Sequence, residues 1–230
     1  MTGGGLRGVI FDFDGVLANS EPLHFRAWRD TLAALGIAMS SDEYYGQYLG
    51  YDDVEMIARL VQDRQLGFDD RRQATLIAEK GERFLGLEQG EGVLFPGAAD
   101  LIRSCAAHVP LAIASGALRH EIEDILAQHR LLPHFRAIVA SGDTARSKPA
   151  PDPYQRAFEL LKPFADGMQP SQCVAVEDSR WGLQSARAVG LRCVGVAASY
   201  PADELAADAD LVVGCVAELR LEDLRRVCAR

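Results

Sequence analysis

The sequence has few cysteines, very few lysines and no long hydrophobic run, and each shortage excludes a class of protein. None of its apolar stretches approaches the roughly 20 residues that a membrane-spanning helix needs, so we expect no membrane partner. Residues 1–5 lack the basic start and apolar centre of a signal peptide. The five cysteines are odd in number, scattered and never spaced as CxxC, which favours reduced thiols in a cytoplasmic protein.

Positive charge is also in short supply. The chain has 24 Lys and Arg against 33 Asp and Glu, and the resulting net charge of −9 argues against a nucleic-acid partner. Only three of the basic residues are lysines, at positions 80, 148 and 162, so each of them is informative. With 230 residues, 48% of them hydrophobic, the chain is large enough for one core and an inserted subdomain.

The hydrophobic periodicity changes along the chain. Residues 21–87 have helical spacing with almost no β-branched runs, whereas strands and helices alternate from about residue 96 onward. Such alternation is typical of a parallel sheet with right-handed crossovers and helices on both faces. We therefore predict an α/β fold: a Rossmann-like, doubly wound parallel core of residues 1–18 and 91–230, and an inserted all-helical cap domain of residues 19–90. Residues 86–97 are predicted to form the return linker.

The most informative segment is FDFDGVLANSEPLH, residues 11–24, which follows a strand-like apolar run. Strand side chains alternate between faces, so Asp12 and Asp14 should point the same way, and Gly15 allows a sharp turn after them. Two carboxylates at the end of a buried strand are costly unless a cation lies between them or one is protonated. Taken alone, the pair could also be a solvated strand end.

Three further motifs each follow a predicted strand, at the edge where open α/β sheets bind ligands. Ser115 lies in ASGA, where a hydroxyl and backbone N–H groups at a strand-to-helix turn suit a phosphate. Lys148 lies in SKPAPDPY, in a proline-rich turn whose backbone is stiff. Glu177 and Asp178 directly follow the apolar run CVAV, as the acidic turn EDS.

These four motifs, in this order, resemble those of the haloacid dehalogenase-like hydrolases, in the β-phosphoglucomutase-like branch that carries a helical cap. The resemblance implies that Asp12 is a nucleophile and Asp14 the general acid/base. It implies a Mg2+ ion bound by Asp12, Asp14 through its backbone carbonyl, and Asp178, with Glu177 either a further ligand or a neighbour of the ligands. A carboxylate can carry a phosphoryl group as an aspartyl-phosphate, and Mg2+ prefers such hard oxygen ligands.

The same resemblance places three more groups at the transferring phosphoryl group. Ser115 and the backbone of Gly116 would contact that group directly. Lys148 would bridge the Asp12 carboxylate and the phosphoryl oxygens. Its alternative role is that of a solvated loop lysine.

In the cap, the resemblance assigns substrate contacts to Ser20, His24, Gly50, Tyr51 and Lys80. Arg83 is close enough in sequence to share this work, although Lys80 and Arg83 could also be solvated helix charges. β-Phosphoglucomutase has an arginine three residues after the loop glycine, where it grips the phosphate that is not transferred. This chain has Asp53 there, and an acid at that place disfavours a bisphosphate and therefore the mutase reaction.

We thus predict a Mg2+-dependent phosphatase that acts on a small phosphorylated metabolite, with a sugar phosphate as the favoured substrate. We expect the protein to be a monomer or weak homo-oligomer. The alternative is a hexose phosphomutase, which returns the phosphoryl group to a sugar hydroxyl rather than to water. A dehalogenase or phosphonate hydrolase is disfavoured because those branches lack an acid at Asp14. A non-catalytic binding protein would be expected to have lost Asp12, Asp14, Lys148 or Asp178, and none is lost.

Overall fold

The computed structural model describes residues 5–49, 51 and 53–229, and the chain divides into two compact units. The core unit comprises Met1–Asn19 and Leu94–Arg230, and the helical unit comprises Ser20–Val93. The sequence placed these divisions after residues 18 and 90. Within the described part of the chain, none of the helices combines the length and the apolar character that crossing a membrane requires.

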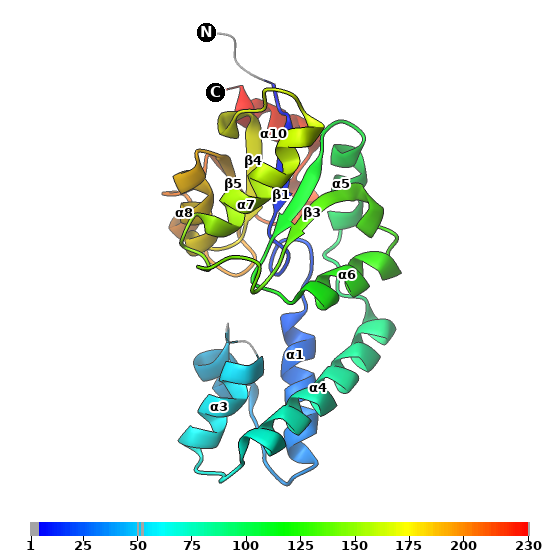
Figure 1. The fold of residues 1–230 in the computed structure, drawn as a ribbon, viewed down its shortest axis with the longest axis vertical. Helices are drawn as coiled ribbons and strands as arrows, with labels where there is room; N and C mark the ends of the chain where they lie inside the picture. Colours follow the sequence, from blue (N-terminus) through cyan, green and yellow to red (C-terminus); the bar gives the residue numbers. More distant parts are fainter. Residues whose placement is uncertain (1–4, 50, 52, 230) are drawn as a thin grey trace. The chain divides into compact units, whose positions relative to one another are not determined.

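The core unit is built on a six-stranded, entirely parallel sheet with the strand order β3-β2-β1-β4-β5-β6 (Figure 1). The chain builds outward from β1 to β3, then returns to the other side of β1 and builds outward again to β6. This order is that of a doubly wound sheet, and the predicted fold class is confirmed. The strands are β1 (Gly8–Phe11), β2 (Leu111–Ala114), β3 (Phe135–Val139), β4 (Cys173–Glu177), β5 (Arg192–Val196) and β6 (Leu211–Val213).

Helices cover both faces of this sheet. Alternate strand residues, Ile10, Ala112 and Ala175 among them, form one buried cluster with α7 and α8, while α5 and α10 pack against each other on the opposite face. Glu177 lies two residues after Ala175, so the alternation directs its side chain toward the face that α7 and α8 cover. The helices are α5 (Ala98–Ala106), α6 (Arg119–Gln128), α7 (Asp152–Leu161), α8 (Arg180–Val189), α9 (Ala202–Leu205) and α10 (Leu221–Cys228), with short 3-10 turns η2 (Leu132–His134), η3 (Lys162–Phe164), η4 (Pro170–Gln172) and η5 (Val216–Glu218).

The described elements of the helical unit are all helices. Its apolar core includes Trp28 and Leu32 from α1, Ile57 and Leu60 from α3, and Leu76 from α4, all fully or almost fully buried. Helix α1 packs along α4. The elements are α1 (Glu21–Ala33), α2 (Ser41–Glu43), the π-helical turn η1 (Tyr44–Tyr48), α3 (Asp53–Asp63) and α4 (Asp70–Glu91).

The predicted return linker is wrong at its start. Helix α4 continues through Gly86 to Glu91, and the backbone leaves the helix at Gly92, which has a φ of 65°. A glycine inside a helix costs only about 1 kcal/mol relative to alanine, so glycines alone do not end one. The non-helical link is therefore 92–97, and it leads into α5, a helix that the sequence did not indicate.

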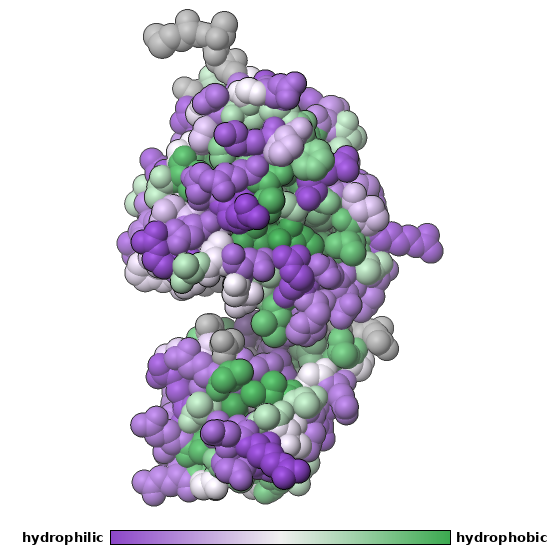
Figure 2. Space-filling model, in the orientation of Figure 1, coloured by the Kyte–Doolittle hydropathy of each residue, from purple (hydrophilic) through white to green (hydrophobic). Residues whose placement is uncertain are grey.

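The surface agrees with the composition. On the face shown in Figure 2, hydrophilic residues predominate in both units, and hydrophobic residues appear in patches among them. Among the large apolar side chains of the described residues, four are more than half exposed: Leu49, Val54, Phe164 and Trp181.

Candidate active site

The predicted core residues meet because their strands are neighbours. Asp12 follows β1, Ser115 follows β2, and Glu177 and Asp178 stand at the end of β4, while Lys148 lies in the loop between β3 and α7. Strand β1 lies between β2 and β4, where the strand order reverses direction. The crevice outside the carboxyl ends of the strands at such a point is where doubly wound folds bind ligands.

Lys148 joins two of the acids. Its Nζ lies 3.0 Å from Asp12 Oδ1 and 2.6 Å from Glu177 Oε1, and it stands 5.1 Å from the centre of the Tyr154 ring. Burial lowers the pKa of Lys148, but the Asp12 and Glu177 carboxylates outweigh that effect and hold the pKa above its usual value. Lys148 is therefore a largely buried permanent cation in contact with the predicted nucleophile.

Three carboxyl groups gather around this lysine. Asp12, Glu177 and Asp178 each offer an oxygen within 4.8 Å of the others, and all three residues are buried. Burial raises the pKa of Asp12 well above its usual range and that of Asp178 to about 7. Burial also opposes ionisation of Glu177, yet Lys148 and the Ser179 donors hold the pKa of Glu177 below its usual value.

The donor set fits a hard divalent cation. When all three acids of this cluster are ionised, they carry two more charges than Lys148 neutralises. Carboxylate oxygens are the ligands that Mg2+ prefers, and it typically uses one or two of them together with waters and phosphate oxygens. Asp14 is half-buried and pairs through its backbone with Ala18, outside this carboxylate cluster.

Gly15 is required by the close approach of Asp178. Its φ is 75°, and a Cβ atom there would lie 1.9 Å from Asp178 Oδ2 and 2.9 Å from Ser199 Oγ. Ser199 also donates a hydrogen bond to Asp178, a contact that lowers the pKa of Asp178 against the effect of burial. Because Ser199 lies beyond β5, no motif in the sequence pointed to it.

Ser115 and Gly116 lie at the same sheet edge. The Ser115 side chain is almost buried, and its Oγ accepts a hydrogen bond from the Ala117 N–H at 3.1 Å. The Ser115 N–H donates to the carbonyl of Val139 at 2.9 Å, which ties β2 to β3 at this edge. Gly116 is exposed, and a Cβ atom there would meet no atom within 4 Å.

In the helical unit, Lys80 holds His24 and Asp53 together. Only 1% of Lys80 is exposed, and its Nζ lies 2.7 Å from Asp53 Oδ2 and 2.6 Å from His24 Nδ1. An ammonium group has only donors, so His24 Nδ1 accepts and the ring proton is at Nε2. Burial and the Lys80 charge hold the pKa of His24 well below its usual value, and its ring stacks on Phe84 at 4.2 Å.

The remaining predicted residues of the helical unit are not part of this cluster. Ser20 is buried and occupies the N-cap position of α1. Tyr51 is partly exposed, with the Arg59 guanidinium 4.1 Å from its ring centre. Arg83 donates to Thr31 Oγ1 at 3.3 Å and to the carbonyl of Glu79 at 3.1 Å. Gly50 lies outside the described residues.

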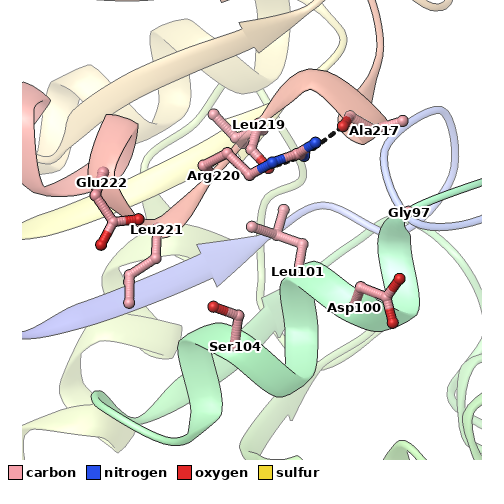
Figure 3. Close-up of a pocket in the computed structure, with 9 residues that line it drawn as sticks. All are labelled: Gly97, Asp100, Leu101, Ser104, Ala217, Leu219, Arg220, Leu221 and Glu222. Atoms are coloured by element: carbon pink, nitrogen blue, oxygen red, sulfur yellow. Dashed lines mark hydrogen bonds between the residues drawn. The ribbon is translucent and has the colours of Figure 1, made fainter.

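A separate surface pocket of about 340 Å3 lies in the core unit, where α5 meets η5 and α10 (Figure 3). None of the predicted site residues lines it. Its charged side chains are of both signs, and the Arg220 guanidinium donates to the carbonyl of Ala217. The lining residues are Gly97, Asp100, Leu101, Ser104, Ala217, Leu219, Arg220, Leu221 and Glu222.

Comparison with known proteins shows that the sequence is similar to hydrolases, one of them a named phosphatase. Residues 6–190 match the model of the haloacid dehalogenase-like hydrolases. The chain is 36% identical to Protein CbbY of Rhodobacter capsulatus over 85% of this chain and 87% of that protein. It is 34% identical to fructose-1-phosphate phosphatase YqaB of Escherichia coli over 82% of this chain and 95% of that protein.

Solved structures agree. CbbY from Rhodobacter sphaeroides has been solved in complex with phosphate and, as a variant, with xylulose-(1,5)bisphosphate. Both structures superpose on this chain with a TM-score of 0.78 and 32% identity, and they cover 95% of this chain and 99% of the other.

Proposed function

The chain belongs to the haloacid dehalogenase-like hydrolase family, and on that premise we propose a Mg2+-dependent phosphatase that hydrolyses a small sugar phosphate through a covalent intermediate on Asp12. The observation that carries the proposal is the contact of Lys148 with Asp12 beside a buried acidic cluster, at the switch point of a doubly wound sheet. The clustering of charge-stabilising groups at this point is what phosphoryl transfer requires.

Asp12 would attack the phosphorus atom, forming a bond from its carboxylate oxygen while the bond to the sugar oxygen breaks. Asp14 would donate its proton to the departing sugar oxygen. In the second half of the reaction, Asp14 would accept a proton from the water that attacks the aspartyl-phosphate, releasing inorganic phosphate and restoring Asp12. Lys148 would balance the negative charge that gathers on the phosphoryl oxygens, and Ser115 would supply a hydroxyl donor to them.

Asp12, Asp178 and the backbone carbonyl of Asp14 would hold the Mg2+ ion, which supplies charge neutralisation and orients the phosphoryl group. The excess negative charge of the buried acids supports this assignment. A sugar phosphate as substrate is supported by relatives that carry the name fructose-1-phosphate phosphatase and, in a solved complex, xylulose-(1,5)bisphosphate. The cytoplasmic location and the monomeric or weakly oligomeric state stay predictions.

The test is release of inorganic phosphate from a panel of sugar phosphates, with and without Mg2+, by the wild-type protein and Asp12→Asn. The amide is nearly isosteric with the acid but cannot form the intermediate, so we expect loss of at least 99% of the activity with the fold intact. Asp100→Asn is the matched control, because the Asp100 side chain is 92% exposed and its activity should equal the wild type.

Two results would contradict the proposal. If Asp12→Asn kept more than a few per cent of the activity, covalent catalysis through Asp12 would be excluded. If β-glucose 1-phosphate were converted to glucose 6-phosphate faster than phosphate was released, the protein would be a phosphomutase instead.

A further inference from the structure

Glu177 stands next to Asp178 in the acidic cluster, yet every acceptor position of its carboxylate is already in use. Oε1 accepts from Lys148 Nζ at 2.6 Å and from the Tyr154 hydroxyl at 3.3 Å. Oε2 accepts from the backbone N–H of Ser179 at 2.8 Å and from its hydroxyl at 2.9 Å. A carboxylate offers about four lone-pair sites, so these four donors leave none for a metal ion.

The direction and the burial of the side chain agree with that count. Glu177 has no exposed surface, and the strand alternation turns it into the layer between the sheet and helices α7 and α8. Gly182 of α8 closes over it, since a Cβ atom at Gly182 would lie 1.6 Å from Glu177 Oε1. The carboxylate is thus packed inside the core rather than opened toward the ligand edge.

Asp12 and Asp178 differ from Glu177 in this respect. Asp12 Oδ1 accepts from Lys148 and from the N–H of Phe13, whereas no donor among the described residues reaches Asp12 Oδ2. Asp12 and Asp178 also keep a small exposed fraction, 8% and 6%. Asp12 therefore retains acceptor capacity, and both carboxylates retain access.

We propose that Glu177 binds no metal ion and is instead the positioning residue that holds the Lys148 ammonium against Asp12. The proposal rests on the proposed function, because it concerns the Mg2+ site of that reaction. Tyr154 and Ser179 fix the Glu177 carboxylate, Glu177 and Asp12 fix the ammonium, and the ion is left to Asp12, Asp178 and the Asp14 carbonyl. The buried acidic cluster is then two sites, one for the lysine and one for the metal.

A single charge change cannot test this inference, because removing any carboxylate a few ångströms from a divalent ion weakens its binding through Coulomb attraction alone. Two charge-balanced double variants remove that difficulty. Lys148→Met with Glu177→Gln deletes one cation and one anion, and so does Lys148→Met with Asp178→Asn. Mg2+ affinity is measured by isothermal titration calorimetry on the full chain without substrate, so the result does not depend on activity.

Both double variants lose Lys148 beside Asp12 and share that cost. We expect the Asp178 double variant to bind Mg2+ at least about tenfold more weakly than the Glu177 double variant, because only the former loses a ligand of the ion. Equal losses in the two double variants would overturn the proposal. An inactive wild-type protein that still showed this pattern would count against the proposed function and not against the ligand assignment.

The positioning role has its own readout in Tyr154→Phe, which keeps the ring and the charge but removes one donor to Glu177. The change loosens the Glu177 carboxylate, and through it the Lys148 ammonium, while the metal ligands stay in place. We therefore expect kcat to fall while the Mg2+ affinity and the substrate KM stay unchanged. A weaker Mg2+ affinity with unchanged kcat at saturating Mg2+ would contradict it. Should a double variant fail to fold, a crystal of the wild-type protein with Mg2+ decides directly: a Glu177 oxygen about 2.0–2.1 Å from the ion would refute the proposal.

Discussion

Asp53→Asn tests whether the helical unit depends on one buried ion pair. Asp53 begins α3 and accepts from Lys80 Nζ at 2.7 Å and from Trp28 Nε1 at 2.9 Å. Lys80 is 1% exposed, and its other polar contact among the described residues is the neutral His24 ring. Asparagine has almost the same shape as aspartate, so the substitution leaves the packing in place and removes the only carboxylate that contacts Lys80 among the described residues.

The expected loss follows from the burial of the pair. Removing one partner of a buried ion pair costs about 3–5 kcal/mol because the other charge is left uncompensated. The Asp53 side chain is 19% exposed, so we expect a loss at the lower end of this range, about 3 kcal/mol. The matched control is Glu55→Gln in the same helix, since Glu55 pairs with Arg59 at 3.0 Å with both side chains about half exposed. An exposed pair of this kind contributes only about 0.3–0.5 kcal/mol.

The assay is urea unfolding followed by Trp28 fluorescence. The chain has two tryptophans, and Trp181 is 55% exposed in the core unit, so a Trp181→Phe background makes Trp28 the single reporter of the helical unit. With a slope of about 1–3 kcal/mol per molar urea, a loss of 3 kcal/mol lowers the midpoint by about 1–3 M. A loss equal to that of Glu55→Gln would refute the reasoning, because Lys80 would then not need the Asp53 charge.

Two further predictions concern the core unit. Burial raises the pKa of Asp178 to about 7, so the metal-free folded protein keeps a proton that the unfolded chain releases near pH 4, and its stability should fall as the pH rises between these values. Mg2+ should therefore raise the melting temperature more at pH 8 than at pH 5.5, and an equal rise at both would contradict this. Gly182→Ala should lower both stability and activity, because its Cβ would lie 1.6 Å from Glu177 Oε1. Gly81→Ala, in open space on α4, should instead stabilise by about 0.4–1 kcal/mol, and thermal melts of the two variants should move in opposite directions.

The sequence predicted the fold class and the gathering of the core site well because both depend on short-range patterns. Asp12 directly follows β1, Asp178 directly follows β4 and Lys148 lies in the loop after β3, and parallel strands bring their carboxyl ends to one edge. The length of α4 was missed because glycine weakens a helix without ending it. Ser199 and Gly182 were missed for another reason. Ser199 contacts Asp178 and Gly182 contacts Glu177, and no sequence spacing predicts either contact.

The contacts of Asp53 could not be predicted from its position in a motif. Its place in the cap loop, three residues after Gly50, led to the expectation of an acid that repels a second phosphate. In the structure its two oxygens are occupied by Lys80 and Trp28, which lie 27 and 25 residues away in the sequence. A carboxylate beside a buried ammonium is neutralised, so its repulsion of another anion is much weaker than that of an isolated charge. Hydrolysis and phosphoryl return are therefore distinguished by the inorganic phosphate released per turnover and not by the Asp53 charge.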